Sequence, residues 1–264
     1  MIPTTQSLEQ WLRHINGDQA VPPSGRKRLT EAVELNRAGE KIVNTFGNRE
    51  FAAAVGFVDM RGFTSKSFGL PPSQVRDVAS PFVNAVITSA ANRHWFVDKT
   101  IGDEVMLIRP DFGEDIRLAL PDLAVGNDIF VEVISLVADI LGTLKSAGVE
   151  EHLSAGFGLG RLILDRIGTS EYAEWTCYGN VVNTAKRLQS VAIPENTGDS
   201  HLLVLGASES EVPSINDKLR VWSTICQQVE RLAFGSPEPQ KKELKGVGVI
   251  AFVASTIELK EQYR

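Results

Sequence analysis

Two short segments of this chain each bring an aspartate to the end of a strand-like apolar run, with a glycine close by. The first segment is Val55–Thr64, which contains Asp59, and the second is Val97–Asp103, which ends at Asp103. The continuous apolar character before Asp59 is typical of a buried strand, whereas the second segment reads as one half of a hairpin. A fold built from these segments has to place a strand end beside a hairpin turn, each with a carboxylate.

Such a pair of carboxylates predicts a site for two divalent cations. Mg²⁺ and Mn²⁺ favour oxygen ligands, and a pair of ions about 3.5–4 Å apart drives phosphoryl transfer by in-line displacement. The main-chain carbonyl of Met60, directly after Asp59, would complete the ligands of one ion, and the sequence offers no imidazole or thiolate cluster for zinc. The alternative is that each aspartate is only a turn residue, because Asp is common beside Gly in tight turns.

A third segment, Gly179–Arg187, places Asn183 and Arg187 at i and i+4, on one face of a helix. In this order, the three segments resemble the catalytic core of the class III nucleotidyl cyclases, and the resemblance extends over residues 50–255. It implies that Asp59 and Asp103 bind the metals and that Asn183 and Arg187 meet the ribose and the triphosphate.

The resemblance and the element order predict an α+β fold, a ferredoxin-like sandwich with a mostly antiparallel sheet and helices packed on it. Residues 49–264 would form this catalytic domain, and residues 1–48 a helical extension with helices at Gln6–Asn16 and Lys27–Ile42. The expected core elements are the strand Phe51–Val58, the helix Ser73–Asn92 with a kink or break at Pro81, the hairpin Trp95–Val97 with Glu104–Ile108, the helix Asn127–Lys145, two strands at Leu153–Leu159 and Arg161–Ile167, the helix Asn180–Val191, a strand at Leu202–Leu205, a helix near Ser208–Arg220 and a strand at Val249–Val253.

Further substrate contacts follow from the resemblance. Lys99, four residues before the second aspartate, and Thr176, three before the helix glycine, stand where the family contacts the base. Phe57 lies on the same face of its strand as Asp59, either in the core or as a wall of the site. The backbone of Gly62, Phe63 and Thr64 could meet phosphates, and a plain N-cap role for Thr64 is equally open.

The chain departs from the family pattern in two places. Arg93-His94-Trp95 stands where members often have small glycines, and the closing strand has Val249 or Ile250 near the position of a lysine directed at the triphosphate. Lys245 matches a different, structural lysine, and Lys186, beside Arg187, reads as a partner in a surface ion pair.

Composition limits the partners. The net charge of −6 argues against nucleic acid as a partner but not against a single nucleotide. Two cysteines without metal-ligand spacing, no signal-peptide pattern and no bilayer-spanning apolar run predict a cytoplasmic protein that does not enter a membrane.

The resemblance also implies a homodimer, because in the family one subunit gives the aspartates and the other the asparagine and arginine. The expected reaction converts a nucleoside triphosphate to a 3′,5′-cyclic nucleotide. A catalytic domain with a small extension favours UTP or CTP, as in the stand-alone pyrimidine cyclases of antiphage defence, whereas the Lys/Thr pair favours ATP. Two alternatives are a degenerate homologue that only binds nucleotide, and another two-metal palm-type enzyme, although the Gly-Gly-Asp/Glu-Glu-Phe hairpin of diguanylate cyclases is absent.

Overall fold

The computed structural model describes residues 50–110, 129–168, 173–191, 200–208 and 240–257. The predicted N-terminal extension, the first two residues of the helix predicted over Asn127–Lys145 and the helix expected near residues 208–220, apart from its first residue, lie outside this part of the chain. The described elements are β1 (Phe51–Met60), α3 (Phe63–Ser67), α4 (Pro72–Asn92), β2 (Phe96–Ile101), β3 (Glu104–Pro110), α6 (Ile129–Ser146), β4 (Leu153–Gly168), β5 (Ala173–Tyr178), α7 (Asn180–Val191), β6 (His201–Ser208), β7 (Gln240–Leu244) and β8 (Gly248–Ile257).

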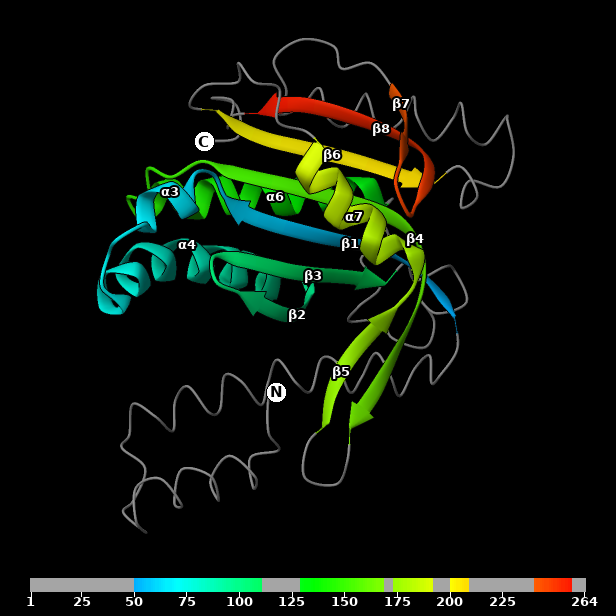
Figure 1. The fold of residues 1–264 in the computed structure, drawn as a ribbon, viewed down its shortest axis with the longest axis horizontal. Coiled ribbons are helices and arrows are strands. Elements are labelled where there is room, and N and C mark those ends of the chain that lie inside the picture. The colour runs from blue at the N-terminus through cyan, green and yellow to red at the C-terminus, as the bar shows by residue number, and fades with distance from the viewer. Residues whose placement is uncertain (1–49, 111–128, 169–172, 192–199, 209–239, 258–264) are drawn as a thin grey trace. The chain divides into compact units, whose positions relative to one another are not determined.

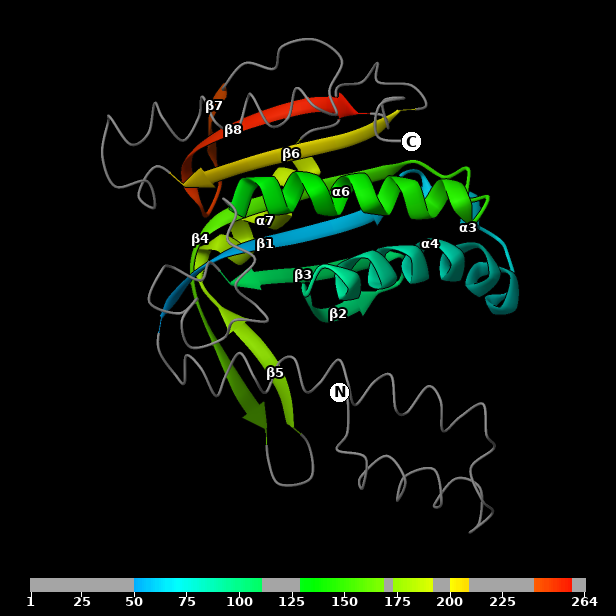
Figure 2. The same cartoon turned by 180° about the vertical axis from the view of Figure 1, so that it is seen from behind.

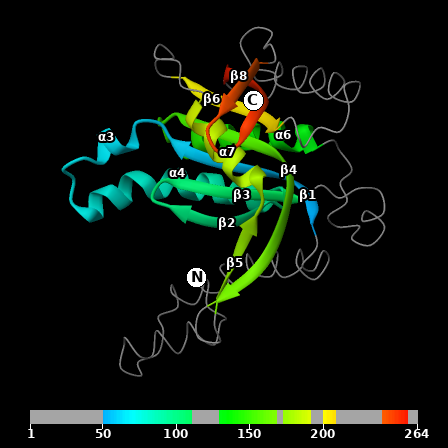
Figure 3. The same cartoon turned by 45° about the vertical axis from the view of Figure 1, so that its right-hand side comes forward.

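The sheet has the order β2-β3-β1-β4-β6-β8-β7 (Figure 1). Its pairs are antiparallel except for β4 and β6, which run parallel and are connected through α7. The strand β1 lies inside the sheet, where it pairs with β3 on one side and β4 on the other, and it leads into α3 and then α4 (Figure 3). This arrangement confirms the predicted α+β fold with a mostly antiparallel sheet.

Helices cover both faces of the sheet. Seen from one side, α7 lies in front of the strands (Figure 1), and the view from behind shows α4 and α6 on the opposite face (Figure 2). A hydrogen bond of 3.0 Å between the hydroxyls of Ser89 and Thr143 joins α4 to α6. On their face of the sheet, Trp95 packs edge-on against Phe157, with ring centroids 5.6 Å apart. The ring of Phe157 fills the space that a side chain at Gly56 would need.

Two glycines of β4 bring α7 into direct contact with the sheet. A Cβ at Gly156 would lie 2.2 Å from the backbone nitrogen of Gln189, and one at Gly158 would lie 2.9 Å from the carbonyl of Val181. Only residues without side chains fit below the helix at these positions. They therefore fix the height of α7 above the strands.

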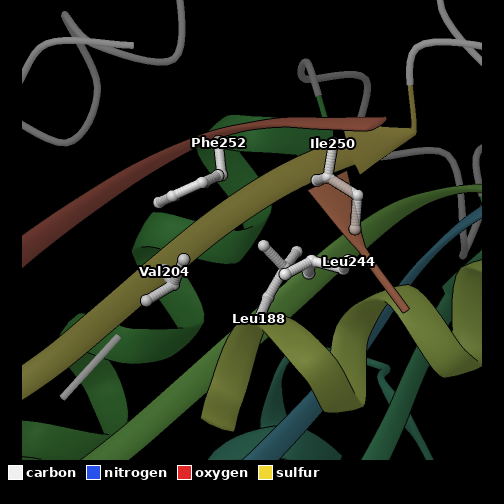
Figure 4. Packing of buried hydrophobic residues seen from close by; sticks show 5 residues of the cluster. All are labelled: Leu188, Val204, Leu244, Ile250 and Phe252. Atoms are coloured by element: carbon white, nitrogen blue, oxygen red, sulfur yellow. The ribbon is translucent and has the colours of Figure 1, made fainter. Parts of the chain in front are cut away.

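Apolar packing against the strands β6, β7 and β8 also holds α7 in place. Leu188 points from α7 into a buried cluster supplied by the last strands of the sheet (Figure 4). The cluster consists of Leu188, Val204, Leu244, Ile250 and Phe252. Because each fully buried aliphatic or aromatic side chain contributes about 1.5–3 kcal/mol, this contact is strong enough to anchor a short helix.

One prediction about the elements was wrong, and two strands were missed. Residues Leu153–Gly168 form one strand, β4, rather than two, because Gly160 and Arg161 continue the pairing with β1. Strands β5 and β7 were not expected. Of the kink or break predicted at Pro81, the break does not occur, because α4 continues through this residue.

The described residues divide into two compact units, of which the smaller contains Glu50 and the described residues of Ile163–Tyr178. In the smaller unit, the end of β4 pairs with β5 from Ile163 opposite Tyr178 to Gly168 opposite Ala173. All the other elements belong to the larger unit.

Candidate active site

The two predicted aspartates meet at one backbone amide in the larger unit. The N–H of Met60 donates to Oδ1 of Asp59 at 3.0 Å and to Oδ2 of Asp103 at 3.2 Å. Asp59 stands near the end of β1, and Asp103 stands in the turn between β2 and β3, where Gly102 takes a positive φ of 66°. The pairing of β1 with β3 therefore brings together two side chains that are remote in sequence.

Electrostatics around Asp59 indicate a place for a cation. Burial, a hydrogen bond with Asp103 and repulsion by Asp103 and Glu104 raise the pKa of Asp59 to about 7, whereas Lys186 opposes this increase. Repulsion between neighbouring carboxylates favours a cation at such a position. Within the described ranges, no group of three or more His, Cys, Asp or Glu side chains is arranged to hold a metal. A site with two carboxylates fits Mg²⁺ or Mn²⁺ shared with substrate phosphates, and it does not fit zinc.

A β-bulge brings Lys99 to the same face of the sheet as the aspartates. In β2, Val97 lies opposite Leu107, yet Lys99 lies opposite the very next residue, Met106, so Asp98 is an extra residue. Met106 in turn lies opposite Phe57 on β1. Since paired residues share a face, Lys99 lies on the face that carries Phe57 and Asp59.

Helix α7 contacts the carboxylates through two residues that were not expected in the site. Lys186 forms an ion pair with Glu104, whose side chain is 11% exposed, and its Nζ also lies 3.4 Å from Oε1 of Gln189. Nε2 of Gln189 donates to Oδ2 of Asp59 at 3.2 Å. Lys186 also lies over the ring of Phe57, 5.4 Å from its centroid. The predicted ion pair of Lys186 exists, and the lysine side chain is 46% exposed as expected, but its partner Glu104 is buried beside the aspartates.

Asn183 and Arg187 lie on the exposed part of α7, one turn apart as predicted. Within the described residues, no hydrogen bond or ion pair joins either of them to Asp59 or Asp103. The structure thus brings the two aspartates together, and among the described residues it joins neither Asn183 nor Arg187 to them.

The remaining predicted contacts lie around the end of β1. Phe57 is buried at 6% exposure, which agrees with the core interpretation, while the cation over its ring places it beside the site as well. Gly62 is the N-cap of α3 and adopts a left-handed conformation. Phe63 is half-buried, and Thr64 is exposed as the second residue of α3, so the N-cap role for Thr64 was wrong.

Thr176 lies in the smaller unit. It is half-buried on β5, opposite Asp165 of β4. Its predicted contact with the base stays a prediction.

The departure Arg93-His94-Trp95 has a structural explanation. His94 adopts a positive φ of 56°, a conformation that glycine takes more easily. The buried guanidinium of Arg109 donates to the carbonyls of Arg93 at 2.7 Å and His94 at 3.1 Å. Arg93 itself forms an ion pair with Asp139 of α6. These contacts hold the turn in its shape without glycines.

The closing strand shows no cation at the expected position. Val249 is 41% exposed, and Ile250 is fully buried in the cluster around Leu188. Lys245 is exposed in the turn between β7 and β8.

The chain has the fold of the adenylyl and guanylyl cyclase catalytic domains, and this confirms the predicted resemblance at the level of the fold. The guanylyl cyclase Cya2 superimposes with a TM-score of 0.57 at 17% identity, over 83% of this chain and 98% of that one. The guanylate cyclase domain of RhGC from Catenaria anguillulae, solved with GTP, gives 0.53 at 18% identity over 80% and 99%. The adenylyl cyclase CyaB from P. aeruginosa gives 0.52 at 16% identity over 81% and 97%.

Sequence comparison finds relatives among mycobacterial proteins. Uncharacterized protein Rv1318c of Mycobacterium tuberculosis (strain ATCC 25618 / H37Rv) is 29% identical over 159 residues, which is 60% of this chain and 27% of that protein. Uncharacterized protein Rv1320c of the same strain is 28% identical over 180 residues, or 67% of this chain and 30% of that protein. The chain thus spans less than a third of the length of these relatives. No family model matches it.

No helix in the described part of the chain combines the length and apolar character needed to span a bilayer.

Proposed function

We propose that the chain is a nucleotidyl cyclase that converts a nucleoside triphosphate to a 3′,5′-cyclic nucleotide and pyrophosphate. The observation that carries this proposal is the convergence of Asp59 and Asp103 on the N–H of Met60 within a cyclase fold. In the reaction, the ribose 3′-oxygen forms a bond to the α-phosphorus, and the bond from the α-phosphorus to the oxygen that bridges it to the β-phosphate breaks. Pyrophosphate leaves with that oxygen, and the proton of the 3′-hydroxyl is released to solvent.

Asp59 and Asp103, with the main-chain carbonyl of Met60, would hold two divalent cations, Mg²⁺ or Mn²⁺. Bound there, the ions would lower the pKa of the ribose 3′-hydroxyl and neutralise the charge on the leaving pyrophosphate. The two carboxylates would supply the negative charge that keeps the ions in place.

Arg187 would bind the α-phosphate, where negative charge develops during the reaction, and Asn183 would orient the ribose. Their spacing of one helical turn lets both contact the same nucleotide. Positioning and charge provide most of the catalysis in phosphoryl transfer, so this division of roles needs no protein nucleophile.

We propose a homodimer with composite sites. Asn183 and Arg187 are exposed and make no hydrogen bond or ion pair to either aspartate among the described residues, so they are available to the site of a second copy. Ile101, at the turn that carries Asp103, is 62% exposed and offers apolar surface to that copy. A two-fold dimer would then have two equivalent sites.

The test of the shared site uses two inactive variants. Asp59→Ala and Arg187→Ala should each abolish cyclase activity alone, because every site in either dimer lacks one group. Mixed after dissociation and reassociation, they should regain part of the activity, since each heterodimer holds one intact site. A mixture that stays inactive, although size-exclusion chromatography with light scattering shows heterodimers, would contradict the composite site.

For the base, we propose a pyrimidine, with UTP or CTP as substrate and a cyclic pyrimidine nucleotide as a second messenger in antiphage defence. The side chain of Lys99 can donate to a carbonyl of uracil or cytosine, as this base requires. ATP is the alternative, supported by the pair Lys99 and Thr176. A lysine donor serves a purine acceptor and a pyrimidine carbonyl equally well, so the pair alone does not select between them.

Incubation of the protein with ATP, GTP, CTP and UTP separately, with Mn²⁺ present and products identified by mass spectrometry, tests the reaction and the base together. A cyclic pyrimidine nucleotide as the main product supports the proposal, and cyclic AMP alone supports the alternative. A dimeric protein that forms no cyclic product would instead be a degenerate homologue that only binds nucleotide.

A further inference from the structure

Gln189 lies between α7 and the carboxylate of Asp59, with only 6% of the residue exposed. Its Nε2 donates to Oδ2 of Asp59 at 3.2 Å, and its Oε1 lies 3.4 Å from Nζ of Lys186. Because a lysine ammonium can only donate, it pairs with the amide oxygen and turns the NH₂ group toward Asp59. Lys186 is itself held by its ion pair with Glu104. The orientation of the amide is therefore set from two sides.

These hydrogen bonds leave Asp59 able to bind a cation. Oδ1 accepts from the N–H of Met60, and Oδ2 accepts from Gln189. Each carboxylate oxygen has two lone pairs, so these two hydrogen bonds leave one on each oxygen, and a metal ion would replace the proton in the hydrogen bond between Asp59 and Asp103. This is the arrangement expected of a partner that orients a metal ligand without replacing it.

The position of Gln189 is fixed by the sheet below it. Its backbone sits directly over Gly156 of β4, and its carbonyl accepts a hydrogen bond of 3.4 Å from Oγ of Ser154. In the pairing of β4 with β1, Gly156 lies opposite Phe57 and Ser154 lies opposite Asp59. The residues of β4 that support Gln189 are therefore the neighbours of the strand segment that carries Asp59. A rigid support on both sides is what an orienting contact requires.

We infer that Gln189, with its amide oriented by Lys186, is a positioning residue for the metal ligand Asp59 of its own subunit. The inference rests on the proposed two-metal site and extends it. In the proposed dimer, α7 then serves two sites at once. Asn183 and Arg187 act on the site of the partner, while Lys186 and Gln189 support the aspartate of their own subunit.

The first test measures metal binding without turnover. Electron paramagnetic resonance of free Mn²⁺ in titrations of the nucleotide-free protein gives its affinity. Gln189→Met keeps the length of the side chain and removes the donor, and we expect about 10- to 100-fold weaker binding. Gln189→Asn keeps an amide but withdraws it by one methylene, so the same direction is expected even if the methionine variant does not fold. Lys145→Met, which removes an exposed lysine of α6 on the opposite face of the sheet, should bind like wild type.

The second test asks in which subunit Gln189 acts. In the heterodimer of Asp59→Ala with Arg187→Ala, the intact site uses Asp59 of the Arg187→Ala subunit. Adding Gln189→Met to that subunit should raise the Mn²⁺ concentration for half-maximal activity about 10- to 100-fold. Adding it to the Asp59→Ala subunit should change that concentration less than about twofold. Equal effects in both subunits, or a larger effect in the second, would overturn the inference and assign Gln189 to the support of Arg187.

The outcomes separate this inference from the proposed function. If folded Gln189→Met and Gln189→Asn bind Mn²⁺ as tightly as wild type while wild type makes a cyclic nucleotide, the positioning role is wrong and the function stands. If wild type makes no cyclic nucleotide but both variants bind Mn²⁺ more weakly, the function is wrong and the positioning role stands.

Discussion

Replacement of Gly156 by alanine should displace α7 from the sheet. The added Cβ would lie 2.2 Å from the backbone nitrogen of Gln189, 2.5 Å from its Cα and 2.6 Å from its Cβ. The first two are backbone atoms, which cannot move aside as a flexible side-chain end can. The helix would have to retreat by about 1 Å to restore ordinary van der Waals contact.

The magnitude follows from this geometry. Overpacking in a well-packed core costs about 1–3 kcal/mol, which in a chain of this size lowers Tm by about 3–10 °C. A shift of about 1 Å also draws the amide of Gln189 away from Asp59, and displacements of that size reduce catalysis by up to about 100-fold. We therefore expect Gly156→Ala to need more Mn²⁺ for half-maximal activity and to unfold at a lower temperature.

The assay pairs thermal unfolding with Mn²⁺ titration of cyclase activity. Gly142→Ala is the matched control, because a Cβ at Gly142 of α6 meets nothing within 4 Å. An alanine within a helix is favoured over glycine by about 1 kcal/mol, so this variant should be unchanged or slightly more stable. A Gly156→Ala variant with the Tm and the Mn²⁺ dependence of wild type would refute the argument that these glycines set the position of α7.

Three other predictions concern stability. His94→Gly should stabilise the protein by about 0.5–1 kcal/mol in urea unfolding, because a positive φ strains residues with a side chain; His94→Ala should not. Arg109→Lys should cost about 1–3 kcal/mol, since Nη1 of the guanidinium donates both hydrogen bonds and the shorter lysine side chain ends before that position; an unchanged urea midpoint would contradict this. Burial, above all, lowers the pKa of His201 to about 4, below its value of about 6.5 in the unfolded chain. The contribution of the neutral imidazole to the free energy of unfolding is therefore complete above about pH 6.5 and is lost as the pH falls toward 4. His201→Asn keeps an acceptor for the N–H of Leu153 and should flatten the dependence of the urea midpoint on pH between those values.

The sequence allowed the central elements to be predicted because their signals are local. Phe51–Val58 is a continuous apolar run, and Gly102 marks the turn of the hairpin, so β1 and β3 were expected within two residues of their observed bounds. The strand β2 was expected to end at Val97 but continues to Ile101. The strand β7 escaped prediction because Gln240–Leu244 is polar, and it becomes a strand only by pairing with β8 at the edge of the sheet.

Within the site, the aspartates were found through motifs, but the support around them was not. The contacts of Lys186 with Glu104 and of Gln189 with Asp59 join α7 to strands far away in the sequence, and no local pattern records such pairs. One signal was available. The alternation of glycines at Gly156 and Gly158 in an apolar strand indicates the close approach of another backbone.

The extra residue at Asp98 has a consequence for how this part of the chain can change in length. The side chains of β2 alternate between the two faces of the sheet, and the extra residue shifts this alternation by one position from Lys99 onward. The stretch from Lys99 to Asp103 lies wholly beyond this point, so an amino acid inserted or lost near Trp95 can be absorbed there without changing that spacing. The same change between Lys99 and Asp103 would fall beyond the bulge and would move Lys99 to the opposite face of the sheet.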